Sequence, residues 1–239
     1  MPVFSAGVNA ARILAATHNI PLYQFSHQEG HLAAALWSAR LNWQEPFIAI
    51  HLSGGTGEML KVTPCSQAEI TDQPNHAVSP QIYKTKIIGD TDLPPGQFVD
   101  RIGVGLGYSF PAGAQLDQLA LTATCRDFRL SGSVKGTHIS FSGPESAAQR
   151  AIEAGVEPSQ IAAAVFDNIG KSLKKAIMTA QEEYGIENVL LMGGVAASKN
   201  LRLYLRSLNI EFASPKYSSD NAVGLAFLAS NYGNNLIFY

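Results

Sequence analysis

The stretch Phe47-Ile-Ala-Ile-His-Leu-Ser-Gly-Gly-Thr-Gly-Glu-Met-Leu-Lys-Val62 decides the fold. Its first six residues are apolar apart from His51 and predict a buried strand over 47–52. The turn Ser53-Gly-Gly-Thr-Gly57 follows, and 58–62 reads as the hairpin partner of that strand. Glycines in such a turn let backbone N–H groups approach a phosphate, and hydroxyls can add hydrogen bonds. Taken alone, the turn is more typical of an ordinary hairpin.

Helices and strands alternate on both sides of this stretch. The expected helices cover 8–17, 28–40, 96–106, 112–123, 145–154, 158–184, 198–207 and 220–231. The further expected strands cover 21–25, 83–88, 137–141, 188–192 and 209–213. Residues 63–82 read as a surface loop or irregular hairpin, and 131–137 as a Gly/Ser connection. No repeat period is present, and the alternation predicts α/β layers.

Composition narrows the class of protein. The 239 residues are 46% hydrophobic and 15% charged, which excludes disorder, and no apolar run reaches the roughly 20 residues of a membrane span. A net charge of −2 gives no overall basic field, so a nucleic-acid partner must be held locally or through another subunit. Cys65 and Cys125 form no C-x-x-C site, and the first residues lack the features of a secretory signal. We therefore expect a cytoplasmic protein.

Three further groups of residues are candidates for chemistry. His27 and His31 lie four apart in a helical segment, so both imidazoles can converge on one metal ion, although that spacing also arises by chance. Gly193-Gly194 lies between a strand and a helix and is either an anion site or a close-packing pair. Asp220 opens the last helix and is either its N-cap or a third metal ligand.

In this order, these blocks resemble the tRNA N6-adenosine threonylcarbamoyltransferase family, once named O-sialoglycoprotein endopeptidases. His27-Gln-Glu-Gly-His31 looks like the H-x-E-G-H metal motif of that family, and Leu52-Ser-Gly-Gly-Thr56 like its S-G-G-H nucleotide loop. The blocks Phe98-Val-Asp100 with Gly113, Ser140-Phe-Ser-Gly143, Gly193-Gly-Val195 and Asp220-Asn-Ala222 resemble its F-D…P-G-G, F-S-F-S-G, G-G-V and D-N-A elements. The resemblance covers nearly the whole chain.

The resemblance implies an actin-like ATPase fold of the sugar-kinase and Hsp70 type, with nucleotide in the cleft between two lobes. It implies that one Fe²⁺ or Zn²⁺ is held by His27, His31 and Asp220. The implied nucleotide site consists of Leu52, Ser53, Gly54, Gly55, Thr56, Asp100, Gly113, Gly193, Gly194 and Ser198. The implied reaction transfers threonylcarbamoyl from threonylcarbamoyl-AMP to N6 of adenosine 37 in tRNA. The implied partners are tRNA, bound within a complex, and other proteins of the same modification pathway.

Several positions depart from the family pattern. Gln97 stands where the family has Glu, and Thr56 stands where its nucleotide loop has His. Ser198 stands in place of a nucleotide-binding Asn, and Glu145 stands in place of a Lys. Family members also open with a β-rich lobe, whereas this chain begins downstream of it. We therefore expect 1–239 to form a single region of the fold with most of the first lobe absent, as in a divergent bacterial paralog. A separate polypeptide would then supply the lobe, or the sequence is a truncated copy or starts at an internal Met.

Three functions stay open. A metal-dependent transferase is favoured by the complete set His27, His31 and Asp220. A non-catalytic paralog that binds nucleotide or a partner is favoured by Ser198, Glu145 and the missing lobe. A metallopeptidase is the third, but a zinc-peptidase helix carries H-E-x-x-H, whereas Glu29 comes two residues after His27 and would point away from the metal.

Overall fold

The computed structural model describes residues 2–73, 79–217 and 222–233. Its helices are α1 (Pro2–His18), α2 (His27–Ser38), α3 (Gln67–Thr71), α4 (Pro95–Gly105), α5 (Gly113–Leu121), α6 (Ser142–Glu153), α7 (Pro158–Tyr184), η1 (a 3₁₀ helix, Gly194–Ala197), α8 (Lys199–Leu205) and α9 (Ala222–Gly233). Its strands are β1 (Phe47–Leu52), β2 (Gly57–Pro64), β3 (Tyr83–Asp90), β4 (Ser133–Lys135), β5 (His138–Ser140), β6 (Val189–Met192) and β7 (Glu211–Phe212). Within these ranges, no helix has the length and apolarity that a membrane crossing requires.

A five-stranded sheet in the order β3-β2-β1-β6-β7 forms the centre of the fold. The hairpin predicted from the opening stretch is confirmed, because β1 and β2 are antiparallel with Leu52 opposite Gly57. β3 pairs with β2 in the antiparallel direction. On the other side of β1, β6 runs parallel to β1, and β7 runs parallel to β6. β4 and β5 form a separate small hairpin. The turns after β1 and after β6 therefore lie at the same edge of the sheet.

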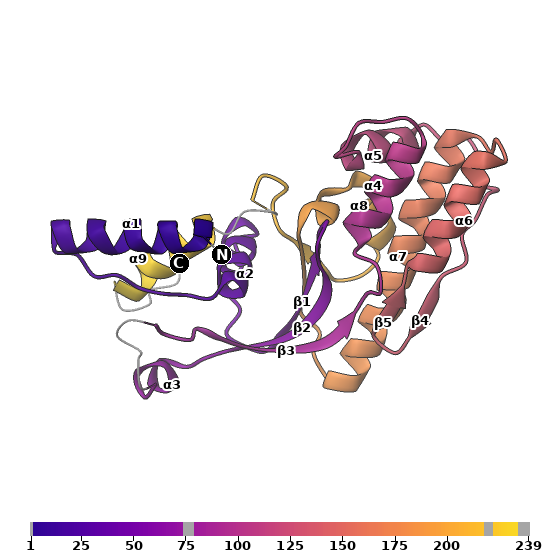
Figure 1. Ribbon diagram of the computed structural model, residues 1–239. Coiled ribbons are helices and arrows are strands. Elements are labelled where there is room, and N and C mark those ends of the chain that lie inside the picture. The colour runs from indigo at the N-terminus through magenta and orange to yellow at the C-terminus, as the bar shows by residue number, and fades with distance from the viewer. Residues whose placement is uncertain (1, 74–78, 218–221, 234–239) are drawn as a thin grey trace.

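Alternate residues of β1 enter two different hydrophobic cores. Ile48, Ile50 and Leu52 pack with α4–α8, whereas Phe47 and Ala49 pack with α2 and α9. In Figure 1 the sheet accordingly stands between a helical layer containing α2 and α9 and a larger group containing α4 to α8. The period of two along β1 decides which residues reach which layer. His51 lies on the same face of β1 as Phe47 and Ala49, which is the face toward α2.

The structure corrects the sequence expectations in four places. Residues 21–25 are irregular instead of forming a strand, because no described strand pairs with them and Pro21 has no N–H to donate. The expected loop over 63–82 contains the end of β2 and the helix α3, which Ser66 and Glu69 cap. Strand β4 forms inside the expected Gly/Ser connection. Helix α1 covers 2–18 instead of 8–17.

Candidate functional site

Two glycine turns meet at the carboxyl ends of β1 and β6. Gly193 has a φ of 95°, and a Cβ there would lie 2.2 Å from the carbonyl oxygen of Leu52, so glycine is required for this approach. In the first turn, Ser53 Oγ accepts hydrogen bonds from the backbone N–H groups of Gly55 (3.3 Å) and Thr56 (3.0 Å). The Ser53 side chain therefore maintains the shape of the turn.

Gly54, Gly55 and Gly194 have a different character, because the packing of the fold does not require them. All three are exposed, and a Cβ at any of them would meet no atom within 4 Å. Their φ angles lie outside the left-handed region. Glycines of this kind let a ligand come close to the main chain, although the N–H of Gly55 already donates to Ser53 Oγ.

A cavity of about 440 Å³ opens beside the two turns. This volume lies in the usual range of small-ligand sites, roughly 300–1,000 Å³. Five predicted nucleotide residues line it, namely Gly54, Asp100, Gly113, Gly194 and Ser198. Leu52 is instead buried in the core, with 1% of its surface exposed. The other predicted residues, Ser53, Gly55, Thr56 and Gly193, belong to the adjacent turns and are not part of the cavity wall.

Two charged residues of the cavity wall, Asp117 and Lys199, were missed by sequence reasoning. The buried Asp117 carboxylate accepts hydrogen bonds from Ser198 Oγ (2.5 Å) and from the backbone N–H groups of Lys199 (2.9 Å) and Asn200 (3.2 Å). It thereby fixes the start of α8 against α5. One signal for Asp117 was available, because it lies one helical turn after Gly113 and on the same face of α5.

A second cavity, of about 710 Å³, adjoins the first and shares Gly54 and Asp100 with it. It extends between α4 and α6, and its further lining residues are Gln97, Arg101, Val104, Gly105, Phe110, Glu145 and Gln149. Phe110 has 76% of its surface exposed. Glu145 Oε1 accepts a hydrogen bond of 3.2 Å from Gln149 Nε2. The two cavities together form a cleft with room for more than one ligand.

The predicted histidine pair converges as its spacing required. His27 Nε2 and His31 Nε2 lie 3.2 Å apart. Two imidazole nitrogens bound to one zinc ion at about 2.0–2.1 Å are separated by roughly 3.3–3.4 Å in tetrahedral geometry. The chemistry and the separation of these donors therefore fit a shared metal ion.

A third imidazole, His51 on β1, lies next to this pair and was not predicted as a site residue. Its ring centroid is 4.9 Å from that of His31. Burial, with smaller contributions from the neighbouring His31 and His27, lowers the pKa of His51 to about 4. His51 is therefore neutral at physiological pH, as a metal-binding imidazole must be. Within the described residues, no three His, Cys, Asp or Glu side chains form a complete metal-ligand group.

The third predicted ligand, Asp220, lies outside the described residues. The described chain resumes with α9 at Ala222. Two residues further on, a Cβ at Gly224 would lie 1.8 Å from the carbonyl oxygen of Gly30, which shows how closely α9 packs against the helix that carries both histidines. The fold thus keeps the start of α9 close to the histidine pair.

Glu29 lies between the two histidines in sequence, but its carboxylate is used elsewhere. Its Oε2 accepts hydrogen bonds from the backbone N–H (3.0 Å) and Oγ (2.8 Å) of Ser26, which completes the capping box of α2. Its Oε1 accepts from the backbone N–H groups of Ile82 (2.7 Å) and Tyr83 (3.4 Å). Both oxygens are therefore occupied in fixing the helix, which argues against a peptidase in which Glu29 is the general base.

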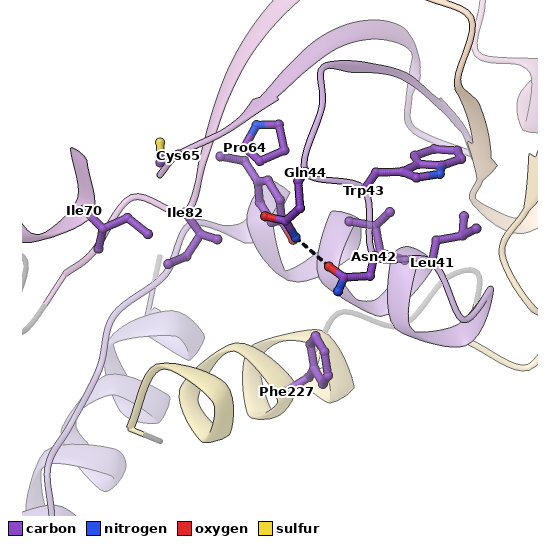
Figure 2. Close-up of a pocket in the computed structure, with 11 residues that line it drawn as sticks. Leu41, Asn42, Trp43, Gln44, Pro64, Cys65, Ile70, Ile82 and Phe227 are labelled. Carbon is purple, nitrogen blue, oxygen red and sulfur yellow. Dashed lines mark hydrogen bonds between the residues drawn. The ribbon is translucent and has the colours of Figure 1, made fainter. Parts of the chain in front are cut away.

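A much smaller pocket, of about 30 Å³, lies between the end of α2, the end of β2 and α9. Figure 2 shows Phe227 of α9 on one side of it and the segment 41–44 on the other, with Gln44 Nε2 donating to Asn42 Oδ1 at 2.6 Å. This volume holds a water molecule or two. Burial raises the pKa of the nearby Cys65 thiol, which makes it a poor nucleophile. The pocket is therefore part of the packing and holds no substrate.

Comparison with solved structures identifies the fold. T. kodakarensis HypF matches 96% of this chain and 39% of its own, with a TM-score of 0.64 and 18% identity. Component A of the Acidaminococcus fermentans (R)-2-hydroxyglutaryl-CoA dehydratase matches 87% of this chain and 69% of its own, with a TM-score of 0.55 and 18% identity. The predicted actin-like ATPase fold is confirmed.

Comparison of sequences identifies the family. Proteins named tRNA N6-adenosine threonylcarbamoyltransferase from Crocosphaera subtropica and Geobacillus kaustophilus are each 30% identical to this chain, over 95% and 92% of its length. The chain spans about 66% and 64% of the lengths of these two relatives. The profile of the same family matches residues 4–227. This chain therefore belongs to the tRNA N6-adenosine threonylcarbamoyltransferase family.

Proposed function

We propose that this chain carries the nucleotide and metal sites of a transferase that moves threonylcarbamoyl from threonylcarbamoyl-AMP to N6 of adenosine 37 in tRNA. One observation carries the proposal. The converging histidine pair, with His27 Nε2 and His31 Nε2 3.2 Å apart, adjoins the end of β1, and the 440 Å³ cavity opens beside the turn that follows the same strand. Such an arrangement serves a reaction at a phosphate-linked acyl group.

In this proposal the adenosine of the substrate occupies the 440 Å³ cavity. Val99 and Phe166 supply apolar contacts for the base, and Asp117 keeps the start of α8 in place at the wall through the hydrogen bonds of its carboxylate. The phosphate then lies toward Gly54 and Gly194, whose backbone is accessible, with the ammonium group of Lys199 to offset its charge.

His27, His31 and Asp220 would hold one Fe²⁺ or Zn²⁺. A divalent ion at this point supplies Lewis-acid polarisation of the acyl group when it is bound. The contribution of the chain itself is orientation, because the capping box of Ser26 and Glu29 fixes the first turn of α2 and with it the two imidazoles. The neutral His51 closes one side of the same site.

The 710 Å³ cavity offers a place for the acceptor. Its exposed Phe110 ring can stack on an unpaired base, which is a common mode of single-stranded RNA recognition. Gln97 and Gln149 add amide groups that can bind a base edge. A base held there would reach the phosphate-linked acyl group across Gly54, which both cavities share.

A protein partner or an N-terminal lobe of the whole protein is part of the proposal. Helix α1 exposes Val8, Ile13 and Leu14, with 48%, 65% and 57% of their surfaces accessible. These side chains point to different sides of α1, and exposed apolar side chains spread around a helix are typical of a segment that packs against another protein. A tRNA substrate supports the expected cytoplasmic location.

A second candidate function is a non-catalytic paralog that binds nucleotide. Two residues support it. The Ser198 hydroxyl is used within the fold, because it donates to the Asp117 carboxylate and accepts from the backbone N–H of Leu201 in α8. Glu145 brings a negative charge to the cleft. In this case the cavity still takes an adenine nucleotide, but no acyl group is transferred.

The test measures threonylcarbamoyladenosine in tRNA by mass spectrometry, with threonylcarbamoyl-AMP, metal and the pathway's partner proteins supplied. We expect product with the wild type and with the control His18→Ala/His138→Ala. The variant His27→Ala/His31→Ala loses both its metal and the product. If no form makes product although AMP still binds, the transferase proposal is wrong and the paralog replaces it. Equal metal content in the wild type and the His27→Ala/His31→Ala variant would refute the metal site.

A further inference from the structure

A group of lysines lies away from the cleft, on β2, β3, β4 and the second half of α7. It consists of Lys61, Lys86, Lys135, Lys171, Lys174 and Lys175, and is called the lysine surface below. Lys86, Lys135, Lys171 and Lys175 are exposed, and Lys61 and Lys174 are half-buried. Acidic residues outnumber basic ones in the whole chain, 19 to 17, so this concentration of positive charge is local.

The contacts of α7 bring one side of this group together. Lys171, Lys174 and Lys175 share a helix face, since they are spaced by three and four residues, while Ser172, Leu173 and Ala176 are buried on the other side. Lys175 Nζ donates a hydrogen bond of 3.3 Å to the carbonyl oxygen of Val134 in β4. Lys135 is the next residue of that strand and is therefore close to the lysines of α7.

The contacts of β3 bring the lysines of β2 and β3 close to those of β4 and α7. Thr137, two residues after Lys135, donates a hydrogen bond from its hydroxyl to the carbonyl oxygen of Ile88 in β3. Lys86 precedes Ile88 by two residues and lies directly opposite Lys61 in the β2–β3 ladder. Lys61 Nζ in turn lies 5.6 Å from the ring centroid of Tyr184, the last residue of α7. Figure 1 shows the lower half of α7 next to β3, β4 and β5.

The nearest carboxylates only partly offset this charge. Asp167, one turn before Lys171, pairs with Arg126 at 2.5 Å, and Asp90 at the end of β3 accepts a hydrogen bond of 2.6 Å from His138. Glu182 and Glu183 lie in the last turn of α7, beyond its lysines but next to Tyr184, so they partly offset Lys61 at the edge of the group. The remaining lysines lie side by side, repel one another and therefore favour a bound polyanion.

We infer that the lysine surface binds the phosphate backbone of a structured RNA, namely the stem of the same tRNA whose base is modified in the cleft. This inference rests on the proposed function for the identity of the RNA. Lys61 lies four residues along β2 from Gly57 at the end of the glycine turn, which is about 14 Å at 3.4 Å per residue, so a stem several base pairs long can reach both. Lysine ammonium groups bind phosphates as point charges without reading sequence, as contacts to a nucleic-acid backbone do.

The test compares tRNA binding to the wild type with binding to Lys86→Gln/Lys135→Gln/Lys171→Gln, in which three exposed cations are neutralised. The control Arg12→Gln/Arg206→Gln/Lys216→Gln removes the same charge from other parts of the surface. Binding of a tRNA transcript is measured by fluorescence anisotropy at salt concentrations from about 50 to 200 mM, because the affinity of phosphate contacts falls steeply over this range. Circular dichroism verifies that each variant is folded.

We expect the lysine-surface variant to bind tRNA at least about tenfold more weakly, with a slope of log affinity against log salt that is smaller by about three. The control should keep the wild-type slope. Equal loss in both variants, or no loss in either, would overturn the inference. Retained tRNA binding together with lost binding to poly-glutamate or to anionic vesicles would assign the surface to an acidic protein or a membrane instead. The assay contains no threonylcarbamoyl-AMP, so its result is independent of whether the chain transfers the acyl group.

Discussion

Replacing Glu29 by alanine tests how the fold positions the histidine pair. Glu29 is 6% exposed, and its carboxylate accepts four hydrogen bonds, two from Ser26 and one each from the backbone N–H groups of Ile82 and Tyr83. Ile82 is itself 3% exposed and does not line the 390 Å³ cavity beside Glu29, so its N–H loses its acceptor, whereas Ser26 and Tyr83 line that cavity and can bind water instead. An unsatisfied buried N–H costs about 1–3 kcal/mol, and half of a capping box about 1 kcal/mol. We therefore expect Glu29→Ala to lower the free energy of unfolding by about 2–4 kcal/mol.

The chain offers a matched control for this change. Ser66 and Glu69 form the same capping box on α3, but the Glu69 side chain is 47% exposed, so water can take over its hydrogen bonds after Glu69→Ala. Urea unfolding followed by circular dichroism measures both variants. Glu29→Gln should fall between the wild type and Glu29→Ala, because its amide oxygen can still accept from Ile82 while its NH₂ group faces the donors of Ser26. If Glu29→Ala proves no more destabilising than Glu69→Ala, the reasoning is refuted.

Four further substitutions test structural and ligand-binding roles of single residues. Gly54→Ala should leave the urea midpoint unchanged but weaken AMP binding about tenfold in calorimetry, whereas Gly193→Ala should destabilise the fold by about 2–4 kcal/mol, because its Cβ meets the Leu52 carbonyl at positive φ. Phe110→Ala should raise the KM for tRNA about fivefold or more and leave AMP affinity unchanged. Burial raises the pKa of Asp92, but hydrogen bonds, the largest from the Ser140 hydroxyl, outweigh it and lower this pKa. The stabilising effect of the carboxylate is therefore present above about pH 4 and is lost as the pH falls through the lowered pKa. Asp92→Asn should be less stable than the wild type in urea unfolding at neutral pH, and the difference should shrink as the pH falls below about 4.

Local patterns in the sequence were sufficient for the elements and for parts of the site. The apolar run 47–52 with its glycine turn predicted the central hairpin, and the spacing of His27 and His31 predicted convergence, because both depend on the geometry of one strand or one helix. The order of the blocks identified the family. The strand expected over 21–25 did not form, since a strand needs a partner that no local pattern specifies.

Only the tertiary structure decided which distant segments share a site. His51 joins the histidine pair because β1 alternates between two cores and turns residue 51 toward α2. Asp117 lines the cavity and holds Ser198, 81 positions away, because α5 packs against the start of α8. The six lysines of the lysine surface come from four elements that meet only through the contacts between α7, β4 and β3. Sequence periodicity determines which side of an element is apolar, but the packing of those sides against one another determines which polar residues meet at the surface.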